Sequence, residues 1–194
     1  MRLTVQSFEK KILKTKSYSK EKIKEFCNIL IEQIDTMSNV ANTFSDFAAL
    51  PKAKLQSLDI VEISRRSLEI FEQNDIGFVS SHPKILINID RTQWVRVMTN
   101  LIQNAIQSVP KERKAKIKVE ITASKNDVKI SFSDNGEGVP TSIKDKIFEP
   151  KFTTKTKGMG LGLGIVKNII DSHGGKINYS SGKGGTKFTI KLKF

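Results

Sequence analysis

The sequence is poor in cysteine, proline and aromatic residues. Its 194 residues include one cysteine, Cys27, and five prolines, and aromatic residues make up 7% of the total. A lone cysteine excludes an internal disulfide, so a reducing compartment is expected. No window reaches the roughly 18 apolar residues that a membrane helix needs, and the start lacks the apolar core of a signal peptide. The chain is therefore expected to be soluble and cytoplasmic.

Positive charge is the most unbalanced feature of the composition. Lys and Arg number 33 against 20 Asp and Glu, which gives a formal net charge of +13. A nucleic-acid binder, a triphosphate site and a surface for an acidic protein all fit this balance. The lysines, however, are spread along the chain and alternate with apolar residues, as in Lys116–Lys118 and Lys187–Lys191. This pattern is typical of the solvated faces of half-buried strands, so no nucleic-acid partner is expected.

A heptad pattern distinguishes the first 50 residues from the rest. Apolar side chains recur in alternating steps of four and three, on one seam of a helix, at Ile23, Cys27, Leu30, Ile34, Met37, Ala41, Phe44 and Ala48. The same spacing occurs on a shorter upstream helix, at Met1, Val5, Phe8 and Ile12. Since a lone antiparallel hairpin cannot cover its own seam, two chains are expected to pair into a four-helix bundle. The alternative is that the seam packs on the chain's own globular domain.

The rest of the chain has the mixed periodicity of helices and strands. Pro51 and the residues up to 56 are interpreted as a linker between a hairpin domain, 1–50, and a second domain, 57–194. The pattern predicts helices over 59–73, 91–109 and 161–172, the first with Asp59 and Glu62 as a capping box. Alternation predicts strands at 85–89, 117–122, 128–133, 176–180 and 187–193. The expected fold class is α+β, a two-layer α/β sandwich in which a mixed sheet packs on helices.

Two asparagines stand on one face of the long helix. Asn100 and Asn104 are four residues apart, so their amides project in the same direction. An amide oxygen is a neutral, hard ligand that suits a Mg²⁺ ion bound to phosphates. Asparagine favours helices weakly, so two on one face indicate a function, although ordinary surface asparagines give the same pattern.

Two glycine-rich segments lie farther along the chain. Asp134-Asn-Gly136-Glu-Gly138 follows a strand, where the carboxylate can accept a hydrogen bond from an exocyclic amine; an ordinary turn is the alternative. Glycines at every second position, Gly158, Gly160, Gly162 and Gly164, precede a helix and suit a loop whose backbone amides face phosphate oxygens. The segment is neither a P-loop, because no Gly-Lys-Ser/Thr follows, nor a dinucleotide fingerprint, because no strand leads into it.

Together with the Pro-interrupted segment 147–157, these blocks resemble the N, G1, F and G2 boxes of sensor histidine kinases. Those kinases belong to the ATP-binding superfamily shared with gyrase, the heat-shock chaperones and the mismatch-repair ATPases. The resemblance covers about residues 57–194 and includes the final Gly184-Gly185-Thr186. The opening residues and the stretch Asp46–Lys52 resemble the nitrogen-regulation branch of the family.

The resemblance implies ATP and Mg²⁺ as cofactors and assigns roles by position. Asn104 would be the metal ligand, and Asn100 would support the phosphates. Asp134 would bind the adenine amine, and Lys155 would reach the terminal phosphates from a lid. Asn100, Asn104 and Lys155 form the implied catalytic group, and the implied nucleotide-binding set is completed by Gly136, Gly138, Phe148, Gly158, Gly160, Leu161, Gly162 and Thr186. The sequence departs from the family at Gln107, where lysine is frequent, and at Gly164, where alanine or serine is usual.

The choice between kinase and ATPase depends on one position. Hydrolases of the superfamily are similar to one another in having a glutamate four residues before the metal-binding asparagine. This glutamate activates water. Here that residue is Asn100, whose amide cannot take a proton at neutral pH. Phosphoryl transfer to a protein histidine, and from there to the receiver domain of a response regulator, therefore fits better. An ATPase or ATP-gated clamp of the same superfamily, or a non-enzymatic binding module drawn to nucleic acid, are the alternatives.

The phosphoacceptor that the resemblance implies is absent from the heptad helices. The chain's two histidines are His82, before Pro83, and His173, before two glycines. The chain is therefore interpreted as a fragment that combines a shortened dimerisation hairpin with a complete ATP-binding domain and cannot autophosphorylate. The resemblance implies a parent protein anchored in the membrane, of which this is the cytoplasmic end.

Overall fold

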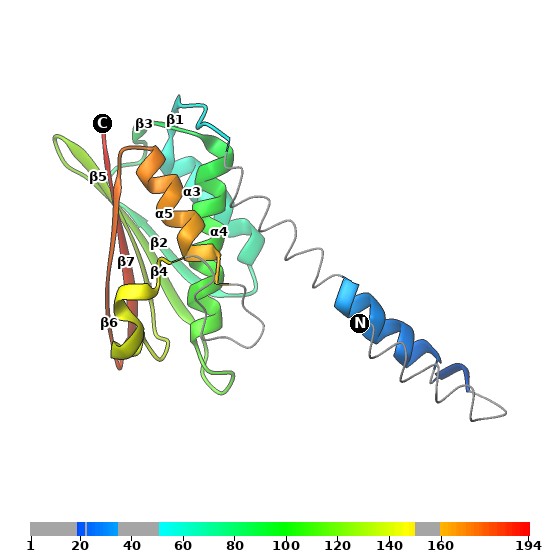
Figure 1. Ribbon diagram of the computed structural model, residues 1–194. Coiled ribbons are helices and arrows are strands. Elements are labelled where there is room, and N and C mark those ends of the chain that lie inside the picture. Colours follow the sequence, from blue (N-terminus) through cyan, green and yellow to red (C-terminus); the bar gives the residue numbers. More distant parts are fainter. Residues whose placement is uncertain (1–18, 22, 35–50, 150–159) are drawn as a thin grey trace. The chain divides into compact units, whose positions relative to one another are not determined.

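The structure is a computed structural model, and it describes residues 19–21, 23–34, 51–149 and 160–194 (Figure 1). The chain divides into two compact units, Met1–Leu50 and Pro51–Phe194, and each is described by itself. In the first unit, residues 20–34 are helical apart from the undescribed position 22. The other residues of the predicted hairpin lie outside the described part. None of the described helices combines the length and the apolar character needed to cross a membrane.

A five-stranded sheet forms one layer of the second unit, in the order β2-β4-β5-β7-β6. The strands are β2 (Asp75–Ser80), β4 (Lys116–Ala123), β5 (Asp127–Asp134), β6 (Lys176–Gly182) and β7 (Gly185–Lys193). β2 runs parallel to β4, and all the other neighbours are antiparallel. The sheet is therefore mixed, as the sequence predicts. A separate antiparallel pair is formed by β1 (Gln56–Asp59) and β3 (Leu86–Ile89).

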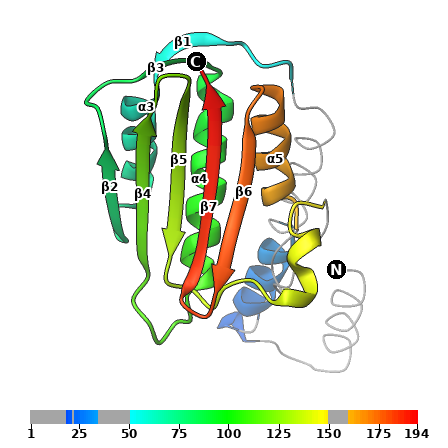
Figure 2. The same ribbon diagram turned by 90° about the vertical axis from the view of Figure 1, so that its left-hand side faces the viewer.

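Three helices cover one face of the sheet, and no described element of this unit covers the other, open face (Figures 1 and 2). They are α3 (Ile60–Leu68), α4 (Arg91–Ser108) and α5 (Gly162–Ser172). Alternate residues of the strands meet these helices, which is why Val119, Ile130 and Ile190 are fully buried. Figure 2 shows α4 crossing behind the middle strands, with α5 beside it behind β6. The two-layer α/β sandwich expected from the sequence is confirmed.

The expected boundaries hold where local signals define them. Asp90 begins α4 by accepting a hydrogen bond from the backbone N–H of Gln93, and Val109 ends it just before Pro110. Burial would raise the pKa of Asp90, but hydrogen bonds from the backbone N–H groups of Gln93, Lys54 and Thr92 outweigh it and keep the pKa below its ordinary value.

Helix α3 differs from its prediction in two respects, one in its first turn and one at its end. Asp59 caps the helix as expected, accepting from the N–H of Val61 at 3.0 Å. Glu62 instead forms an ion pair with Arg66, with 2.7 Å between the charged atoms. The α-helix ends at Leu68 and continues only as a 3₁₀ turn, Glu69–Phe71, so the predicted end at residue 73 is wrong. β1 begins at Gln56, the last residue of the segment interpreted as a linker.

Candidate functional site

Helix α4 holds the two asparagines on a rigid support. Trp94, almost fully buried, donates from its indole Nε1 to the hydroxyl of Ser64 on α3 at 3.0 Å. The side chains on the same side of α4 are completely or almost completely buried, namely Val97, Met98, Leu101 and Ile102. Asn100 and Asn104 lie at the border of this buried face and are half-buried. Their positions are therefore set by the core rather than by a loop.

The asparagines face the start of α5. Asn100 donates from Nδ2 to the carbonyl of Arg96 at 2.8 Å, which fixes the amide and leaves Oδ1 as an acceptor. A Cβ placed on Gly162 would come within 2.8 Å of that Oδ1 and 3.9 Å of Nδ2 of Asn104. Only a residue without a side chain lets the two helices approach this closely. Asn100, Asn104 and Gly162 are therefore brought together.

The first turn of α5 has no side-chain cap among the described residues. Leu161, buried to 5% exposure, is the residue before the helix, and it makes no side-chain capping bond. Gly160 precedes it with φ of 65°, a conformation that favours glycine. The first N–H groups of a helix lack partners within the helix and attract anions. The N–H groups at this end of α5 can donate to a phosphate oxygen beside the Asn100 amide.

Asp134 ends β5 and is held by three donors on a single oxygen. Its Oδ1 accepts from the backbone N–H of Gly136 at 2.9 Å, from that of Thr186 at 3.1 Å, and from the Ser108 hydroxyl at 3.2 Å. Among the described residues, none is placed to donate to Oδ2. The carboxylate is thereby oriented, with one oxygen available to an incoming donor such as an exocyclic amine.

Glycines line the walls around Asp134 because neighbouring atoms leave no room for side chains. A Cβ on Gly136 would lie 2.1 Å from Oγ of Ser108, and one on Gly185 would lie 1.9 Å from the Asp134 carbonyl oxygen. Gly138 has φ of 80° and meets the carbonyl oxygen of Gly182. The turn from Asp134 to Gly138, for which an ordinary turn was the alternative interpretation, is thus packed against the end of α4 and the β6–β7 hairpin.

Thr186 lies next to Asp134. Its side chain is buried, and its hydroxyl is 3.1 Å from Oγ of Ser181. Ser181 also accepts from the backbone N–H of Val139 at 2.7 Å, which ties the segment after β5 to the β6–β7 hairpin. Asp134, Gly136, Gly138 and Thr186 therefore form one polar cluster at this end of the sheet.

Phe148 takes part in an aromatic cluster. Its ring meets Tyr179 and Phe188 edge-on, with centroid distances of 6.1 and 6.4 Å, and these two rings stack on each other at 5.9 Å. Burial raises the pKa of Tyr179, with a smaller contribution from Asp145. The Tyr179 hydroxyl donates to the carbonyl of Lys144 at 2.8 Å. The ring of Phe148 thus anchors the segment leading to 150–159, and its part in nucleotide binding stays a prediction.

Lys155 and Gly158 lie outside the described residues, so their predicted roles stay predictions. Ser108 is the residue of the cluster that sequence reasoning missed. Its contact with Asp134 joins residues 26 positions apart. The only local signal is a serine as the last residue of a helix, which also suits a plain helix end.

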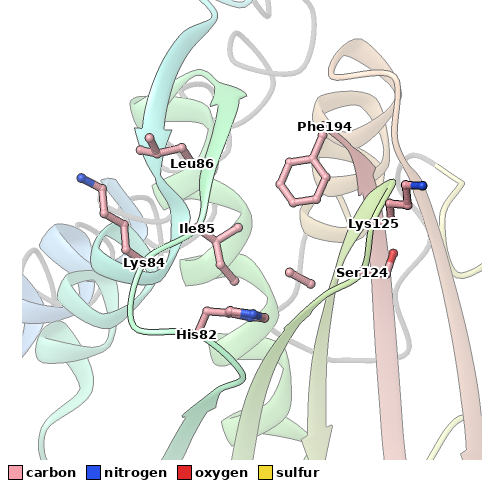
Figure 3. A pocket seen from close by; sticks show the side chains of 8 residues that line it. His82, Lys84, Ile85, Leu86, Ser124, Lys125 and Phe194 are labelled. Atoms are coloured by element: carbon pink, nitrogen blue, oxygen red, sulfur yellow. The ribbon is translucent and has the colours of Figure 1, made fainter.

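A hollow of about 450 Å³ lies elsewhere, at the end of β5 and β7 opposite to Asp134 and Thr186. It is bordered by the segment from His82 to Leu86, the β4–β5 turn and Phe194. Figure 3 shows Ile85 and the Phe194 ring facing this space, while the Lys84 amine points away. None of the sequence-predicted site residues lines it.

The donor set near α4 and α5 fits a magnesium ion that is bound mainly through a ligand's phosphates. Among the described residues, no group of three or more His, Cys, Asp or Glu could hold a metal by protein ligands alone. The amide oxygens of Asn100 and Asn104 are the neutral oxygen donors at the site. Mg²⁺ retains water and phosphate ligands and accepts one or two protein oxygens, which this arrangement can supply.

The chain is similar to known proteins in sequence and in fold. Residues 89–194 match the family described as histidine kinase-, DNA gyrase B-, and HSP90-like ATPase. The nitrogen regulation protein NtrY of Azorhizobium caulinodans is 28% identical over 200 residues, covering 99% of this chain but only 26% of that protein. The chain thus spans about a quarter of the length of this relative.

Solved structures of histidine kinases share the fold. The nucleotide-free catalytic domain of histidine kinase ThkA is 33% identical, with a TM-score of 0.66 over 72% of this chain and 95% of that one. ThkA in complex with the response regulator protein TrrA is 26% identical, with a TM-score of 0.77 over 98% of this chain and 57% of that one. With residues 89–194 matching the family model, the chain belongs to the histidine kinase-, DNA gyrase B- and HSP90-like ATPase family and carries the catalytic ATP-binding domain of sensor histidine kinases.

Proposed function

We propose that residues 51–194 bind Mg·ATP between α4, the start of α5 and Asp134, and present its γ-phosphoryl group to a histidine outside this chain. The observation that carries the proposal is the meeting of Asn100 and Asn104 with Gly162 at the first turn of α5. The Asp134 cluster lies at the end of the same helix α4, where Ser108 contacts it. The phosphate-binding and base-binding elements thus share one wall.

Each residue would have a distinct task. Asn104 would contribute an oxygen to Mg²⁺, and Oδ1 of Asn100, held in place by the Arg96 carbonyl, would support the same assembly. The uncapped N-terminus of α5 would stabilise phosphate charge. Lys155, from the segment outside the described residues, would neutralise the terminal phosphates. The bound Mg²⁺ would supply electrostatic stabilisation, and most of the catalysis would come from positioning.

Transfer is favoured over hydrolysis because α4 offers no general base. No residue of this helix, Arg91–Ser108, is an Asp or a Glu. Asn100 stands at the position where the hydrolases of the superfamily are similar to one another in having a glutamate. Its amide cannot accept a proton from water. The chain's own histidines are also committed elsewhere. Nε2 of His173 accepts from the N–H of Asp90, and Nδ1 of His82 bonds the hydroxyl of Ser81.

The remaining features of the proposal concern the parent protein. Residues 1–50 would be a dimerisation hairpin without the phosphoacceptor, 51–56 the connection, and 57–194 the catalytic domain. The described part of the heptad helix supports pairing of two chains, since Ile23 and Ile34 are 44% and 51% exposed. A response regulator receiver domain would take the phosphoryl group onward, as suits the ThkA relative solved with TrrA. The parent would be a membrane sensor.

Calorimetric titration with Mg·ADP tests the nucleotide site. Asn104→Ala should weaken binding at least tenfold, about 1.4 kcal/mol, because a metal ligand is lost. Its binding should also become insensitive to EDTA, whereas the wild-type affinity should depend on Mg²⁺. Gln103→Ala is the matched control, since this neighbour on α4 is exposed. Absence of wild-type binding at tens of micromolar would contradict the proposed site.

Phosphate release separates the kinase from an ATPase. The chain alone should neither turn over ATP appreciably nor label itself with γ-phosphate. Supplying a separate hairpin that bears the phosphoacceptor histidine should produce labelled hairpin, provided that Mg·ATP is present. Robust steady-state hydrolysis without an acceptor would instead favour the ATPase or ATP-gated clamp.

A further inference from the structure

Ser108, the last residue of α4, contacts the Asp134 turn at Asp134 and Glu137 and lies close to Gly136. Its hydroxyl lies 3.2 Å from Oδ1 of Asp134 and 2.8 Å from the carbonyl oxygen of Ala105. Its own carbonyl accepts from the backbone N–H of Glu137 at 3.2 Å. The missing side chain of Gly136 leaves the room for this approach, since a Cβ there would lie 2.1 Å from Oγ of Ser108. The end of α4 and the turn are thus fitted to each other.

The single proton of the Ser108 hydroxyl has two acceptors. The Ala105 carbonyl is neutral, whereas the Asp134 carboxylate is charged, and hydrogen bonds to an ionised acceptor are about twice as strong as neutral ones. Donation to Asp134 adds a side-chain donor to the two backbone donors on Oδ1, from Gly136 and Thr186. All three hold the same oxygen, so the carboxyl plane cannot rotate without breaking them. Oδ2 is left as the oxygen that meets a ligand.

An oriented carboxylate distinguishes purines by the group at position 6. Adenine carries an amino group there, which donates a hydrogen bond to Oδ2. Hypoxanthine and guanine carry a carbonyl oxygen, whose lone pairs oppose those of the carboxylate. A binding site discriminates strongly between two ligands when the wrong ligand leaves a polar group of the site without a hydrogen-bond partner. The sharper the orientation of Asp134, the larger this difference becomes.

We propose that Ser108 is a positioning residue that sets the preference of this site for 6-amino over 6-oxo purine nucleotides by fixing the orientation of the Asp134 carboxylate. The inference rests on the proposed nucleotide site. Ser108 itself does not need to touch the base. It acts through Asp134, and its loss leaves the phosphate-binding half of the site, at Asn100, Asn104 and α5, unchanged.

The test compares ADP with IDP, which differ at purine position 6, in calorimetric titrations of the full chain with Mg²⁺. Ser108→Ala should weaken ADP binding about fivefold and change IDP binding less than twofold, so the affinity ratio narrows. Ser172→Ala is the matched control. Ser172 is the last residue of α5, and its hydroxyl lies 2.7 Å from the carbonyl oxygen three residues earlier, as the Ser108 hydroxyl lies 2.8 Å from that of Ala105 in α4. Its ratio should equal that of the wild type.

Each other result overturns the inference. Equal weakening of ADP and IDP in Ser108→Ala would show that the serine only supports the helix end, and unchanged affinities for both nucleotides would show that Asp134 needs no help. Ser108→Cys, which keeps the shape and donates a much weaker hydrogen bond, decides the matter if the alanine variant does not fold; it too should narrow the ratio. Failure of the wild-type chain to bind ADP at all would strike the proposed function itself.

Discussion

Asp134 is the residue whose surroundings make the most definite statement about specificity. Two backbone N–H groups, of Gly136 and Thr186, donate to Oδ1, and backbone donors cannot be turned into acceptors. An asparagine at this position would therefore keep its carbonyl oxygen on that side and direct its amide nitrogen toward the ligand. The ligand-facing atom would change from an acceptor to a donor.

Asp134→Asn should accordingly invert the preference for the base. ADP should bind at least about tenfold more weakly, because two donors would face each other, at a cost of roughly 1–3 kcal/mol. IDP should bind more tightly to the variant than to the wild type. Titration of both nucleotides measures this, and thermal melting verifies that the variant is folded. Equal loss of both nucleotides would show that Asp134 contributes charge or structure and does not select the base.

His173 joins the end of α5 to the start of α4. Its Nδ1 donates to the carbonyl of Ile169 at 2.7 Å, and its Nε2 accepts from the backbone N–H of Asp90 at 3.0 Å. These partners define a neutral ring with the proton on Nδ1, because a carbonyl can only accept and an N–H can only donate. The ring thus satisfies a backbone donor at the cap of the helix that carries the asparagines.

His173→Ala should lower the free energy of unfolding by roughly 1–3 kcal/mol, since it removes both bonds and leaves the Asp90 N–H without its partner. Urea denaturation followed by circular dichroism measures the loss. His82→Ala is the comparison, because His82 is exposed, and it should change stability by less than about 0.5 kcal/mol. A loss of similar size in both variants would contradict a structural role specific to His173.

The residues of the site were predictable to the extent that their type and spacing were local. The spacing of Asn100 and Asn104 places both amides on one helix face, and the structure sets that face against Gly162. Asp134 and Thr186, 52 positions apart, meet because β5 pairs with β7. Here the family resemblance, and not periodicity, supplied the prediction. Ser108 could not be found either way, since its role depends on how the end of α4 fits the Asp134 turn.

At the scale of the elements, helices and strands marked by local sequence signals were predicted, whereas strands that depend on long-range pairing were missed. The prediction for α4, 91–109, agrees with Arg91–Ser108 within one residue because Asp90 and Pro110 define both ends. The hairpin strands β4 and β5 were also predicted from a local signal, because alternating apolar and polar residues lie on both sides of a polar turn. β1 and β2 were missed. β2 contains Gly77 and is stabilised by parallel pairing to β4. The residues next to β2 in the sequence give no sign of this pairing.

The open face of the sheet carries a row of like charges. Lys129, Lys191 and Lys176 lie directly opposite one another across β5, β7 and β6. Lys191 is paired with Asp127 at 2.8 Å, whereas no ion pair among the described residues involves Lys129 or Lys176. Like charges directly opposite each other on neighbouring strands destabilise a sheet.

Lys129→Glu should therefore stabilise the domain by roughly 0.2–1 kcal/mol, because it places an opposite charge beside Lys191. The gain should shrink at high salt, which screens exposed charges. Urea denaturation at low and high sodium chloride measures both effects. Lys52→Glu makes the same charge change at an exposed position outside the sheet and is the control. An equal gain in the control would trace the effect to net charge and not to the strand register.

At the scale of the whole molecule, the chain has a formal net charge of +13. The open sheet face accounts for a good part of it, with lysines at alternate positions of β4, β5 and β7, as in Lys116, Lys118, Lys129, Lys187, Lys191 and Lys193. Some are compensated in place. Glu120 pairs with Lys118 at 2.7 Å and with Lys187 at 3.8 Å, and the Lys118 hydrogen bond is the main reason why its pKa is lowered. These are solvated faces of strands, as expected from their alternation.

The helix at 20–34 raises the remaining question at this scale, that of pairing. Ile23 and Ile34 lie on the heptad seam and are 44% and 51% exposed. Exposed side chains of this size at helical spacing are typical of a surface that another helix covers. If two chains pair through this seam, a charge on it must be buried at the interface without a partner, which is strongly unfavourable.

Ile34→Asp should therefore weaken dimerisation at least about tenfold, or 1.4 kcal/mol, measured by sedimentation equilibrium across a range of chain concentrations. Asn28→Asp introduces the same charge on the same helix at an exposed position off the seam, and it should dimerise like the wild type. Mg·ADP affinity should be equal in all three proteins, because the nucleotide site is built from the second unit alone. A wild-type chain that stays monomeric at high micromolar concentration would contradict pairing through this seam and favour the alternative, in which the seam packs on the chain's own globular domain.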